Sequence, residues 1–537
     1  RYRTNSNSFA KIPGKPIAYW VNSIQLYAFN QERLENYANA CTGMQTGNNL
    51  LFTRNWYEVN INKTNIYKAK ECKWFKYNEG GEARKWYGNH LGVVNWENDG
   101  LEIKNHKSSV VRNEKYYFKE GITWKRIGSS KLAFRYLPSG FIFDQSGDSL
   151  FVKKEEDLYY ILGFLNSRVA ESFKSILAPT LNLTAGNIKY FPIIIPSSNV
   201  KSDIKDKVLE NIKISKEDWD SHEISWDFRR DALIKYKDES NLISNSYVKR
   251  KEKMDEYSSS LKYNEEKLNE IFISMYKLEN ELKPDVLSKD ISITLPSMEG
   301  SVKEFLSYFV GTVMGRYSLD IEGLAYAGGE FDESKYKTFK PNPNGLILLT
   351  DDHYFENDII VRLREFLSVA FSPDTVDENL RWLAESLEMK KNESPEERLR
   401  RYFLDEFFKD HCKTYQKRPI YWLVDSGKQK GLRTLIYMHR YQPDTMATIR
   451  FDHLQEIQAK YQNEIEMIDT RLANPSLSAT DRRNLEKAKI SYQKKIEELQ
   501  EFDKHLAVYA NEQIEIDLDD GVKVNYAKFD KVLAKIK

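Results

Sequence analysis

The strongest constraint on the fold lies in residues 452–510, where two apolar patterns with helical spacing follow one another. The first consists of Leu454, Ile457, Tyr461, Ile465, Ile468 and Leu472, and the second of Leu485, Ala488, Tyr492, Ile496, Leu499 and Leu506. Steps of three and four residues place such side chains on one face of a helix. Asn474-Pro475 separates the patterns, and proline cannot continue a helix. The sequence therefore predicts an antiparallel helical hairpin.

The remaining sequence changes character near residue 200. Between residues 41 and 198, short aromatic and β-branched runs alternate with Gly, Asn and Ser, which is typical of strands and turns. We expect one helix from Asp157 to Leu177 within this region, another over Ile24–Ala40 before it, and an extended run over 192–196 at its end. Beyond it we expect a long charged helix over 250–282 and a strand over 345–349.

These patterns predict an α+β fold, with a twisted β-rich domain followed by a long helical spacer and a helical C-terminal region that contains the hairpin. The chain has 537 residues, and single cores stop growing near about 250–300 residues, so we expect several domains. The predicted division is a connector at 1–40, the β-rich domain at 41–198, the spacer at 199–290, a small mixed domain at 291–400 and a C-terminal domain at 401–537.

The composition argues against a membrane protein, a disulfide-rich protein and a zinc protein. The sequence contains no apolar run of about 18 residues, so it predicts no membrane span. Cys41, Cys72 and Cys412 are the cysteines, and none is part of a CxxC pair. This predicts neither a disulfide framework nor a zinc site and fits a reducing bacterial cytoplasm. The first residue is Arg1, and we expect a piece that begins within a longer protein.

Charge is distributed unevenly along the chain. Residues 1–198 contain 27 Lys and Arg against 17 Asp and Glu, a net charge of +10, whereas the remaining 339 residues contain 54 against 63, a net charge of −9. A basic front segment is typical of a protein that holds a polyanion there. The alternative is a chance fluctuation in a lysine-rich protein.

Catalytic motifs are missing from the sequence. DNA amino-methyltransferases use an Asn/Asp-Pro-Pro-Tyr/Phe tetrapeptide to hold the flipped base, but this chain has no Pro-Pro pair. It also has no glycine-rich turn suited to S-adenosylmethionine, no HExxH, no P-loop and no GxSxG. His411 lies beside Cys412 without further ligands at suitable spacing. We therefore predict no catalytic, cofactor-binding or metal residues in this chain.

Two kinds of segment predict contacts with nucleic acid. Basic residues alternate with aromatic residues in the runs 70–77 and 84–87, where cations can contact phosphates; the alternative is that the rings form a core and the lysines are solvated. In the stretch Thr42–Val59, glycines bracket a polar turn and allow close approach of the backbone to a ligand. The candidates from these segments are Asn48, Asn49, Arg54, Lys73, Lys76, Arg84 and Lys85.

The same stretch, with Ile12–Trp20 upstream, resembles the point where BREX phage-defence adenine methyltransferases of the PglX type pass from catalytic domain to DNA recognition. The run 118–126 resembles a Gly-Ile-Thr-Trp segment in the recognition domains of TaqI-type adenine methyltransferases, and 134–144 resembles the strand pair that follows it there. This resemblance implies DNA contacts by Thr123, Lys125, Arg126 and Arg135, although a structural ion pair is an alternative for both arginines. Further runs that resemble these families are 182–188, 216–228, 315–329, 417–422 and 519–526.

The resemblance covers essentially the whole chain and implies the C-terminal half of a site-specific adenine DNA methyltransferase. This half would bind duplex DNA, recognise the target sequence and position the adenine, while a preceding domain would bind S-adenosylmethionine and transfer the methyl group. The main alternative is a protein-interaction scaffold that docks other BREX proteins or is bound by a phage DNA-mimic inhibitor. A third alternative is a restriction endonuclease remnant.

Overall fold

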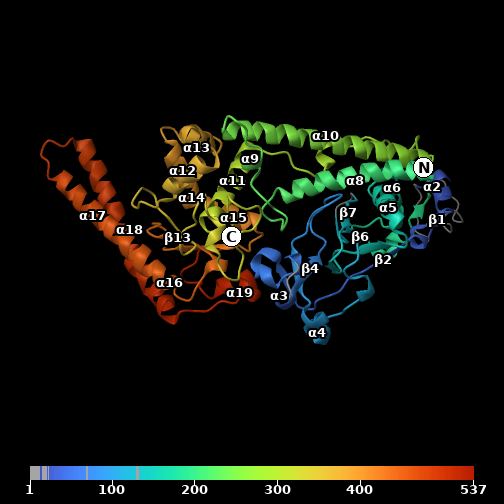
Figure 1. The fold of residues 1–537 in the computed structure, drawn as a ribbon, viewed down its shortest axis with the longest axis horizontal. Helices are drawn as coiled ribbons and strands as arrows, with labels where there is room; N and C mark the ends of the chain where they lie inside the picture. The colour runs from blue at the N-terminus through green and yellow to red at the C-terminus, as the bar shows by residue number, and fades with distance from the viewer. Residues whose placement is uncertain (1–11, 15–20, 22, 68–70, 129–131) are drawn as a thin grey trace, which may run out of the picture. The chain divides into compact units, whose positions relative to one another are not determined.

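The computed structural model describes residues 12–14, 21, 23–67, 71–128 and 132–537 (Figure 1). These residues form two compact units. Unit 1 comprises residues 1–56, 62–226 and 251–296, and unit 2 comprises 57–61, 227–250 and 297–537. Most of the segment Ile12–Trp20, to which the sequence assigns a junction, and Lys70 lie outside the described residues.

Two four-stranded sheets form the β-rich part of unit 1. The first is antiparallel in the order β2-β9-β6-β7, and the second has the order β3-β5-β4-β8 with β4 and β8 parallel. The strands of the first sheet are β2 (Ala38–Cys41), β9 (Ser149–Val152), β6 (Gly121–Trp124) and β7 (Phe134–Leu137). Those of the second are β3 (Thr53–Asn55), β5 (Gly92–Asn95), β4 (Trp74–Asn78) and β8 (Ile142–Phe143). The strands expected between residues 41 and 198 are therefore present.

The helix predicted over Ile24–Ala40 is wrong beyond its first turns. Helix α2 spans only Ser23–Ala28, because the chain then turns and the Leu34 N–H donates to the Phe191 carbonyl at 2.9 Å. Strand β1 (Glu32–Arg33) pairs antiparallel with β10 (Pro192–Ile193). The extended run predicted at 192–196 thus contains β10, the strand that pairs with β1. This pairing replaces the helix that the sequence predicted for residues 32–33.

A break also divides the single helix predicted from Asp157 to Leu177. Helix α5 spans Leu158–Leu165 and α6 spans Arg168–Leu177. Asn166 turns away to bond the backbone of Phe134, accepting from its N–H at 2.9 Å and donating to its carbonyl at 3.0 Å. Ser167 then caps α6 by accepting from the Ala170 N–H. Local side-chain bonds of this kind compete with helix continuation.

The remaining helices of unit 1 support the sheets. Helix α5 packs against β6 and β7 of the first sheet, and α8 packs against α5 (Figure 1). Val208 of α8 and Leu268 of α10 join the same core. The helix α10 begins seven residues before the predicted 250–282 segment and ends earlier, at Met275, where Lys277 adopts a left-handed conformation that terminates helices. The bounds are α3 Asn49–Phe52, α4 Glu97–Asn105, α7 Ala185–Ile188, α8 Ser198–Asp220 and α10 Ile243–Met275.

Unit 2 is mainly helical and contains one three-stranded antiparallel sheet in the order β11-β13-β12. Its first strand, β11 (Leu346–Leu349), confirms the strand predicted there. The other strands are β12 (Tyr421–Asp425) and β13 (Arg433–Tyr437). The helices outside the hairpin are α9 Ala232–Lys235, α11 Met298–Val313, α12 Ile359–Ala370, α13 Val376–Glu385, α14 Pro395–Asp405, α15 Phe407–Thr414, α16 Thr445–Thr448 and α19 Gly521–Ala527.

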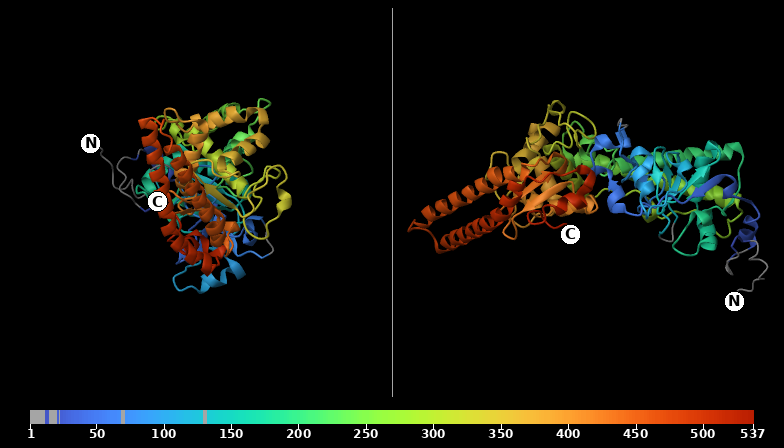
Figure 2. Two further views of the ribbon diagram at one scale, coloured as in Figure 1. Left: turned by 90° about the vertical axis from the view of Figure 1, so that its left-hand side faces the viewer. Right: turned by 90° about the horizontal axis from the view of Figure 1, so that it is seen from below.

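The helical hairpin of unit 2 confirms the prediction for 452–510. Helix α17 spans Gln455–Leu472 and continues a π-helical turn at Ile449–Leu454, and α18 spans Ala479–Glu512. Ile457, Tyr461 and Leu499 are among the buried residues of its apolar faces. Figure 2 shows the two helices extending side by side from the rest of unit 2.

These elements confirm the α+β fold class. The five-part division made from the sequence stays a prediction, since the contacts group the chain into two units, and the spacer helix α8 belongs to the same unit as the sheets. No helix within the described ranges combines the length and the apolar character that crossing a bilayer requires.

Candidate nucleic-acid interface

Three loops of unit 1 meet at one end of the first sheet because of its strand register. Cys41 pairs with Ser149, and Ser149 also pairs with Thr123. The segments that follow β2 and β6 and the segment that precedes β9 therefore leave the sheet at the same end. These segments are 42–49, 125–128 and 144–148, and we call them the end loops.

Hydrogen bonds join the end loops to one another. The Gln45 amide donates to Gln145 Oε1 at 2.5 Å, and the Arg126 N–H donates to the Ser146 carbonyl at 3.0 Å. Within 144–148, Asp144 Oδ1 accepts from the N–H groups of Ser146 and Gly147. The end loops are thus a connected surface rather than independent segments.

The two glycines of the 42–49 loop allow close packing against the protein itself. A Cβ atom at Gly43 would lie 2.2 Å from the Phe143 carbonyl oxygen, and one at Gly47 would lie 2.5 Å from the Ser108 carbonyl carbon. Gly47 also has a φ of +71°, a conformation that favours glycine. The close approach that the structure shows is to strand β8 and to the 107–119 segment, and the predicted approach to a ligand stays a prediction.

A basic segment lies against the 42–49 loop. Gln45 and Val110 exchange backbone hydrogen bonds of 2.8 and 2.9 Å, and Ser109 Oγ donates to the Thr46 carbonyl at 2.5 Å. The segment 107–119 exposes four cationic side chains, Lys107, Arg112, Lys115 and Lys119. These four residues are not among the predicted contact residues. The excess of four basic residues over one acidic residue within 13 positions could have indicated a phosphate-binding segment.

Four of the eleven predicted contact residues lie on the end loops. Asn48, Asn49 and Lys125 are exposed, and Arg126 is half-buried. Asn48 caps α3 by accepting from the Leu51 N–H at 3.2 Å, and Asn49 accepts from the Thr46 hydroxyl. Lys125 and Arg126 directly follow β6. These residues form the part of the predicted set that can contact a large surface ligand together.

Lys76 lies on β4 of the second sheet and Lys73 directly precedes that strand, and both lie beside aromatic rings. Lys73 Nζ is 5.5 Å from the centre of the Trp74 ring, and Lys76 Nζ is 5.6 Å from that of Trp226. Such cation–π contacts stabilise the positions of the ammonium groups. Both side chains are half-buried, so contact with DNA through them stays a prediction.

Three further candidates hold parts of unit 1 together. Arg84 forms an ion pair with Asp218 of α8 at 2.6 Å, and Lys85 forms one with Glu265 of α10 at 2.7 Å. Thr123 is buried, accepts from the Asn78 amide at 2.7 Å and donates to the Asp148 carbonyl at 3.1 Å. The described contacts of these side chains are structural. The structural ion pair that was the alternative for Arg126 and Arg135 is thus found at Arg84.

Arg54 and Arg135 are buried arginines that donate to backbone carbonyls. Arg54 donates to the carbonyls of Leu50 and Thr53 at 2.6 and 2.7 Å. Arg135 has an exposed fraction of 0% and donates to the Gly80 carbonyl at 3.0 Å. Burial lowers the Arg135 pKa to about 10, since the charged form loses hydration. Neither guanidinium lies on the surface that the end loops present.

The last residue of the end loop 144–148, Asp148, has a buried carboxylate. Asp148 Oδ2 accepts from the Ala185 N–H at 3.0 Å, while Oδ1 has no hydrogen-bond partner. Burial raises the pKa of Asp148 to about 6, and Arg126 opposes this rise through its positive charge. The buried Asp148 carboxylate therefore interacts electrostatically with the half-buried candidate Arg126. The spacing of Arg126 and Asp148 in the sequence gave no indication that their charges interact.

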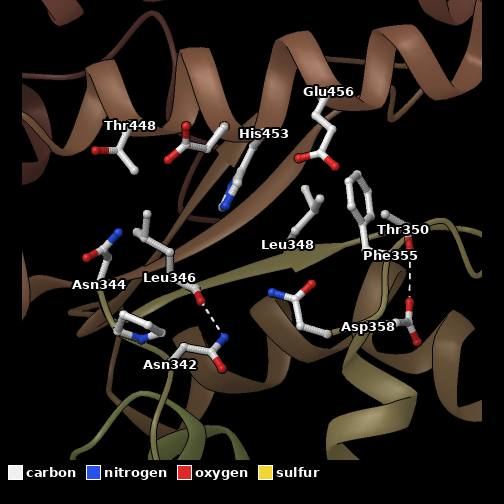
Figure 3. A pocket seen from close by; sticks show the side chains of 13 residues that line it. Asn342, Asn344, Leu346, Leu348, Thr350, Phe355, Asp358, Thr448, His453 and Glu456 are labelled. Carbon is white, nitrogen blue, oxygen red and sulfur yellow. Dashed lines mark hydrogen bonds between the residues drawn. The ribbon is translucent and has the colours of Figure 1, made fainter.

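Unit 2 contains a separate pocket of about 240 Å³ between β11 and the helix that begins the hairpin (Figure 3). His453 and Glu456 point from the helix toward Leu346 and Leu348 on the strand. The His453 pKa is lowered to about 4 by burial, and the ring lies 3.2 Å from the Thr434 hydroxyl. Asp452 and Glu456 make the rim negative, which disfavours phosphate. The pocket is therefore not part of the candidate interface.

Metal ligands do not cluster in the described part of the chain, where no group of three or more His, Cys, Asp or Glu side chains could hold an ion. His411 is engaged instead with the backbone, since its Nε2 accepts from the N–H groups of Ile420 and Tyr421 at 3.1 and 3.0 Å. Burial lowers its pKa to about 3, so it is neutral at ordinary pH.

Comparisons with known proteins identify relatives over nearly the whole chain. An adenine-specific methyltransferase PglX of Lacticaseibacillus casei (strain Zhang) is 40% identical over 548 residues, which cover 98% of this chain and 45% of the relative. An adenine-specific methyltransferase BrxX of Escherichia coli O9:H4 (strain HS) is 37% identical over 562 residues, covering 99% of this chain and 46% of the relative. No family model matches.

The fold and these comparisons define the protein in two steps. The chain is an α+β protein in which a β-rich part with a basic surface is supported by long helices. It belongs to the family of the PglX and BrxX adenine-specific methyltransferases, which confirms the resemblance seen in the sequence. The chain spans about half the length of the curated relatives that it matches.

Proposed function

We propose that this chain binds duplex DNA and recognises the target sequence of a BREX adenine-specific DNA methyltransferase. The observation that carries the proposal is the connected surface of end loops, on which the predicted contact residues Asn48, Asn49, Lys125 and Arg126 lie together. Cationic side chains can bind phosphates, and amides can bond base edges. The names of the relatives, which are adenine-specific methyltransferases, support adenine as the base that the parent protein methylates.

In this proposal the methyl transfer takes place outside the chain. A catalytic domain elsewhere in the parent protein binds S-adenosylmethionine and accepts the flipped adenine, and the parent protein works in the bacterial cytoplasm. The present chain holds the duplex in register with that domain. Lysine and arginine contacts fix the position of the backbone, whereas amide side chains discriminate among bases.

A direct test compares two pairs of basic residues at opposite ends of the first sheet. Lys125 and Arg126 follow β6 at the end-loop side, and Lys153 and Lys154 follow β9 at the other side. We expect the Lys125→Ala/Arg126→Ala variant to lose affinity for a labelled duplex in fluorescence anisotropy, and the Lys153→Ala/Lys154→Ala variant to match the wild type. Equal losses in both variants would contradict a localised interface.

A second candidate function is a protein-interaction scaffold, and the hairpin favours it. Met467 of α17 and Ile490 of α18 are more than half exposed. Apolar side chains exposed on an extended helical element suit contact with other proteins, such as other BREX proteins or a phage DNA-mimic inhibitor. Duplex binding without sequence preference, combined with capture of such a protein, would favour this function over the first.

A further inference from the structure

The short helix α3 presents two leucines to solvent beside the predicted contact residues, Leu50 and, less exposed, Leu51 with an exposed fraction of 44%. Leu50 has an exposed fraction of 57% and follows Asn48 and Asn49 in the chain. Exposed leucines are by themselves ordinary on a protein surface, and Leu51 lines an adjacent hollow. The position of Leu50 is unusual because its backbone is fixed by several independent contacts.

Buried groups hold the turn that carries Leu50. The Arg54 guanidinium donates to the Leu50 carbonyl at 2.6 Å and lies 5.4 Å from the centre of the Trp74 ring. The Thr53 hydroxyl donates to the Asn49 carbonyl at 3.0 Å. Phe52 anchors the same turn, since it is fully buried and packs edge-on against His106. A turn fixed in this way lowers the entropic cost of ordering the backbone when its exposed side chain binds.

An acidic hollow and a basic segment both lie near α3. Leu51 and Phe52 line a hollow with Leu101, whose rim includes Glu97 and Glu102. Leu50 does not line this hollow. The 42–49 loop that leads into Leu50 packs instead against the segment 107–119, with its four exposed cations. Glu114 is the acidic residue of that segment, and it pairs with Lys104 at 2.6 Å.

We propose that Leu50 makes an apolar contact with the bases of the bound duplex, and that Arg54 positions it by fixing the Leu50 carbonyl. This inference rests on the proposed function and adds a residue that discriminates among sequences. Apolar side chains recognise the thymine methyl group or enter between base steps, while the surrounding cations bind phosphates. The cationic segment beside the 42–49 loop is complementary to DNA, whereas the acidic rim near Leu101 is not.

The test uses a duplex that the wild-type chain retains from a randomised pool, together with a scrambled duplex of equal length. Leu101 provides a matched control because its exposed fraction is 58%. In fluorescence anisotropy we expect Leu50→Ala to bind the selected duplex about tenfold more weakly, which corresponds to about 1.4 kcal/mol. Its binding to the scrambled duplex should be unchanged. Leu50→Met, which conserves volume, and Leu101→Ala should both stay within about twofold of the wild type.

The outcomes separate this inference from the proposed function. Wild-type preference for the selected duplex, with Leu50→Ala equal to the wild type, would overturn the role of Leu50 alone. An equal loss in Leu101→Ala, or an equal loss on both duplexes, would also overturn it. Retention of no duplex, or no preference between the two, would overturn the proposed function and this inference together. Circular dichroism of each variant checks that the fold is retained.

Discussion

The Nη2 atom of Arg84 lies 2.6 Å from Oδ2 of Asp218, and this ion pair joins the segment between β4 and β5 to helix α8. Arg84 also donates to the carbonyls of Tyr87, Ser215 and Ser292. Its guanidinium therefore connects three separate segments of unit 1. The presence of an arginine beside aromatic residues in the sequence fits both this structural role and a phosphate contact.

Replacing Arg84 should destabilise the chain. Arg84→Ala leaves the buried Asp218 carboxylate without its cation, and breaking a buried pair from one side costs about 3–5 kcal/mol. We expect a lower urea midpoint for unfolding, followed by circular dichroism, with Arg84→Lys between the variant and the wild type. Unchanged stability combined with weaker duplex binding would instead assign Arg84 to DNA contact.

Replacing Arg126 tests whether the end loops recognise DNA bases. If it reads a base, Arg126→Ala should weaken binding of a selected duplex by about 1–3 kcal/mol and relax preference at one position. Competition between the selected duplex and its single-base variants measures both effects. Binding within error of the wild type on all duplexes would remove Arg126 from the interface.

The segment 107–119 should contribute phosphate contacts. Lys107→Ala and Arg112→Ala should each weaken binding to all duplexes similarly and reduce the slope of log K against log salt concentration by about 1. Affinities measured at several sodium chloride concentrations give this slope. A loss confined to one sequence, with an unchanged slope, would assign the residue to base recognition instead.

Gly47 should tolerate no side chain. Gly47→Ala places a Cβ atom 2.5 Å from the backbone of Ser108 at a residue with a φ of +71°. Both effects strain the 42–49 loop, and we expect a loss of about 1–3 kcal/mol in unfolding free energy. A urea titration measures it. As a control, Gly14→Ala, at a residue with a φ of +80°, should have a smaller effect because no atom of the described residues beyond its chain neighbours lies within 4 Å of the new Cβ.

Asp148 should make stability depend on pH in a defined window. Its pKa rises from 3.8 to about 6 on folding because of burial, so the folded state binds the proton more tightly than the unfolded state between these values. Stability from this group is therefore greatest below about pH 4 and falls as pH rises toward 6, by up to about 3 kcal/mol. Asp148→Asn should gain stability relative to the wild type over this range. Urea midpoints that differ by a constant amount from pH 4 to 7 would contradict it.

Much of the fold could be predicted because local patterns determine it. The hairpin of α17 and α18 follows from its apolar spacing, and β11 follows from a short apolar run after a glycine. Predictions failed where distant residues compete for the backbone. Leu34 bonds Phe191 instead of continuing a helix, and Asn166 bonds Phe134 and divides α5 from α6. Single-sequence periodicity carries no information about such partners.

The candidate site was predictable only in part for the same reason. The glycines and amides of the sequence indicated the loop at Asn48, and the family resemblance indicated Lys125 and Arg126, which the structure places on the same surface. It could not distinguish these side chains from Arg84 or Arg135, because burial depends on which segments pack together. It also did not single out Leu50, because the fixed turn and the neighbouring charges from which its role is proposed are visible only in the structure.

The proposal that this chain recognises a DNA sequence is tested most directly when the chain itself selects DNA. The chain is incubated with a pool of randomised duplexes at two salt concentrations, and the retained duplexes are sequenced. The account predicts enrichment of one asymmetric motif at both concentrations, with less total DNA retained at the higher one because phosphate contacts are salt-dependent. Retention without any enriched motif, or no retention at either concentration, would contradict sequence recognition by this chain.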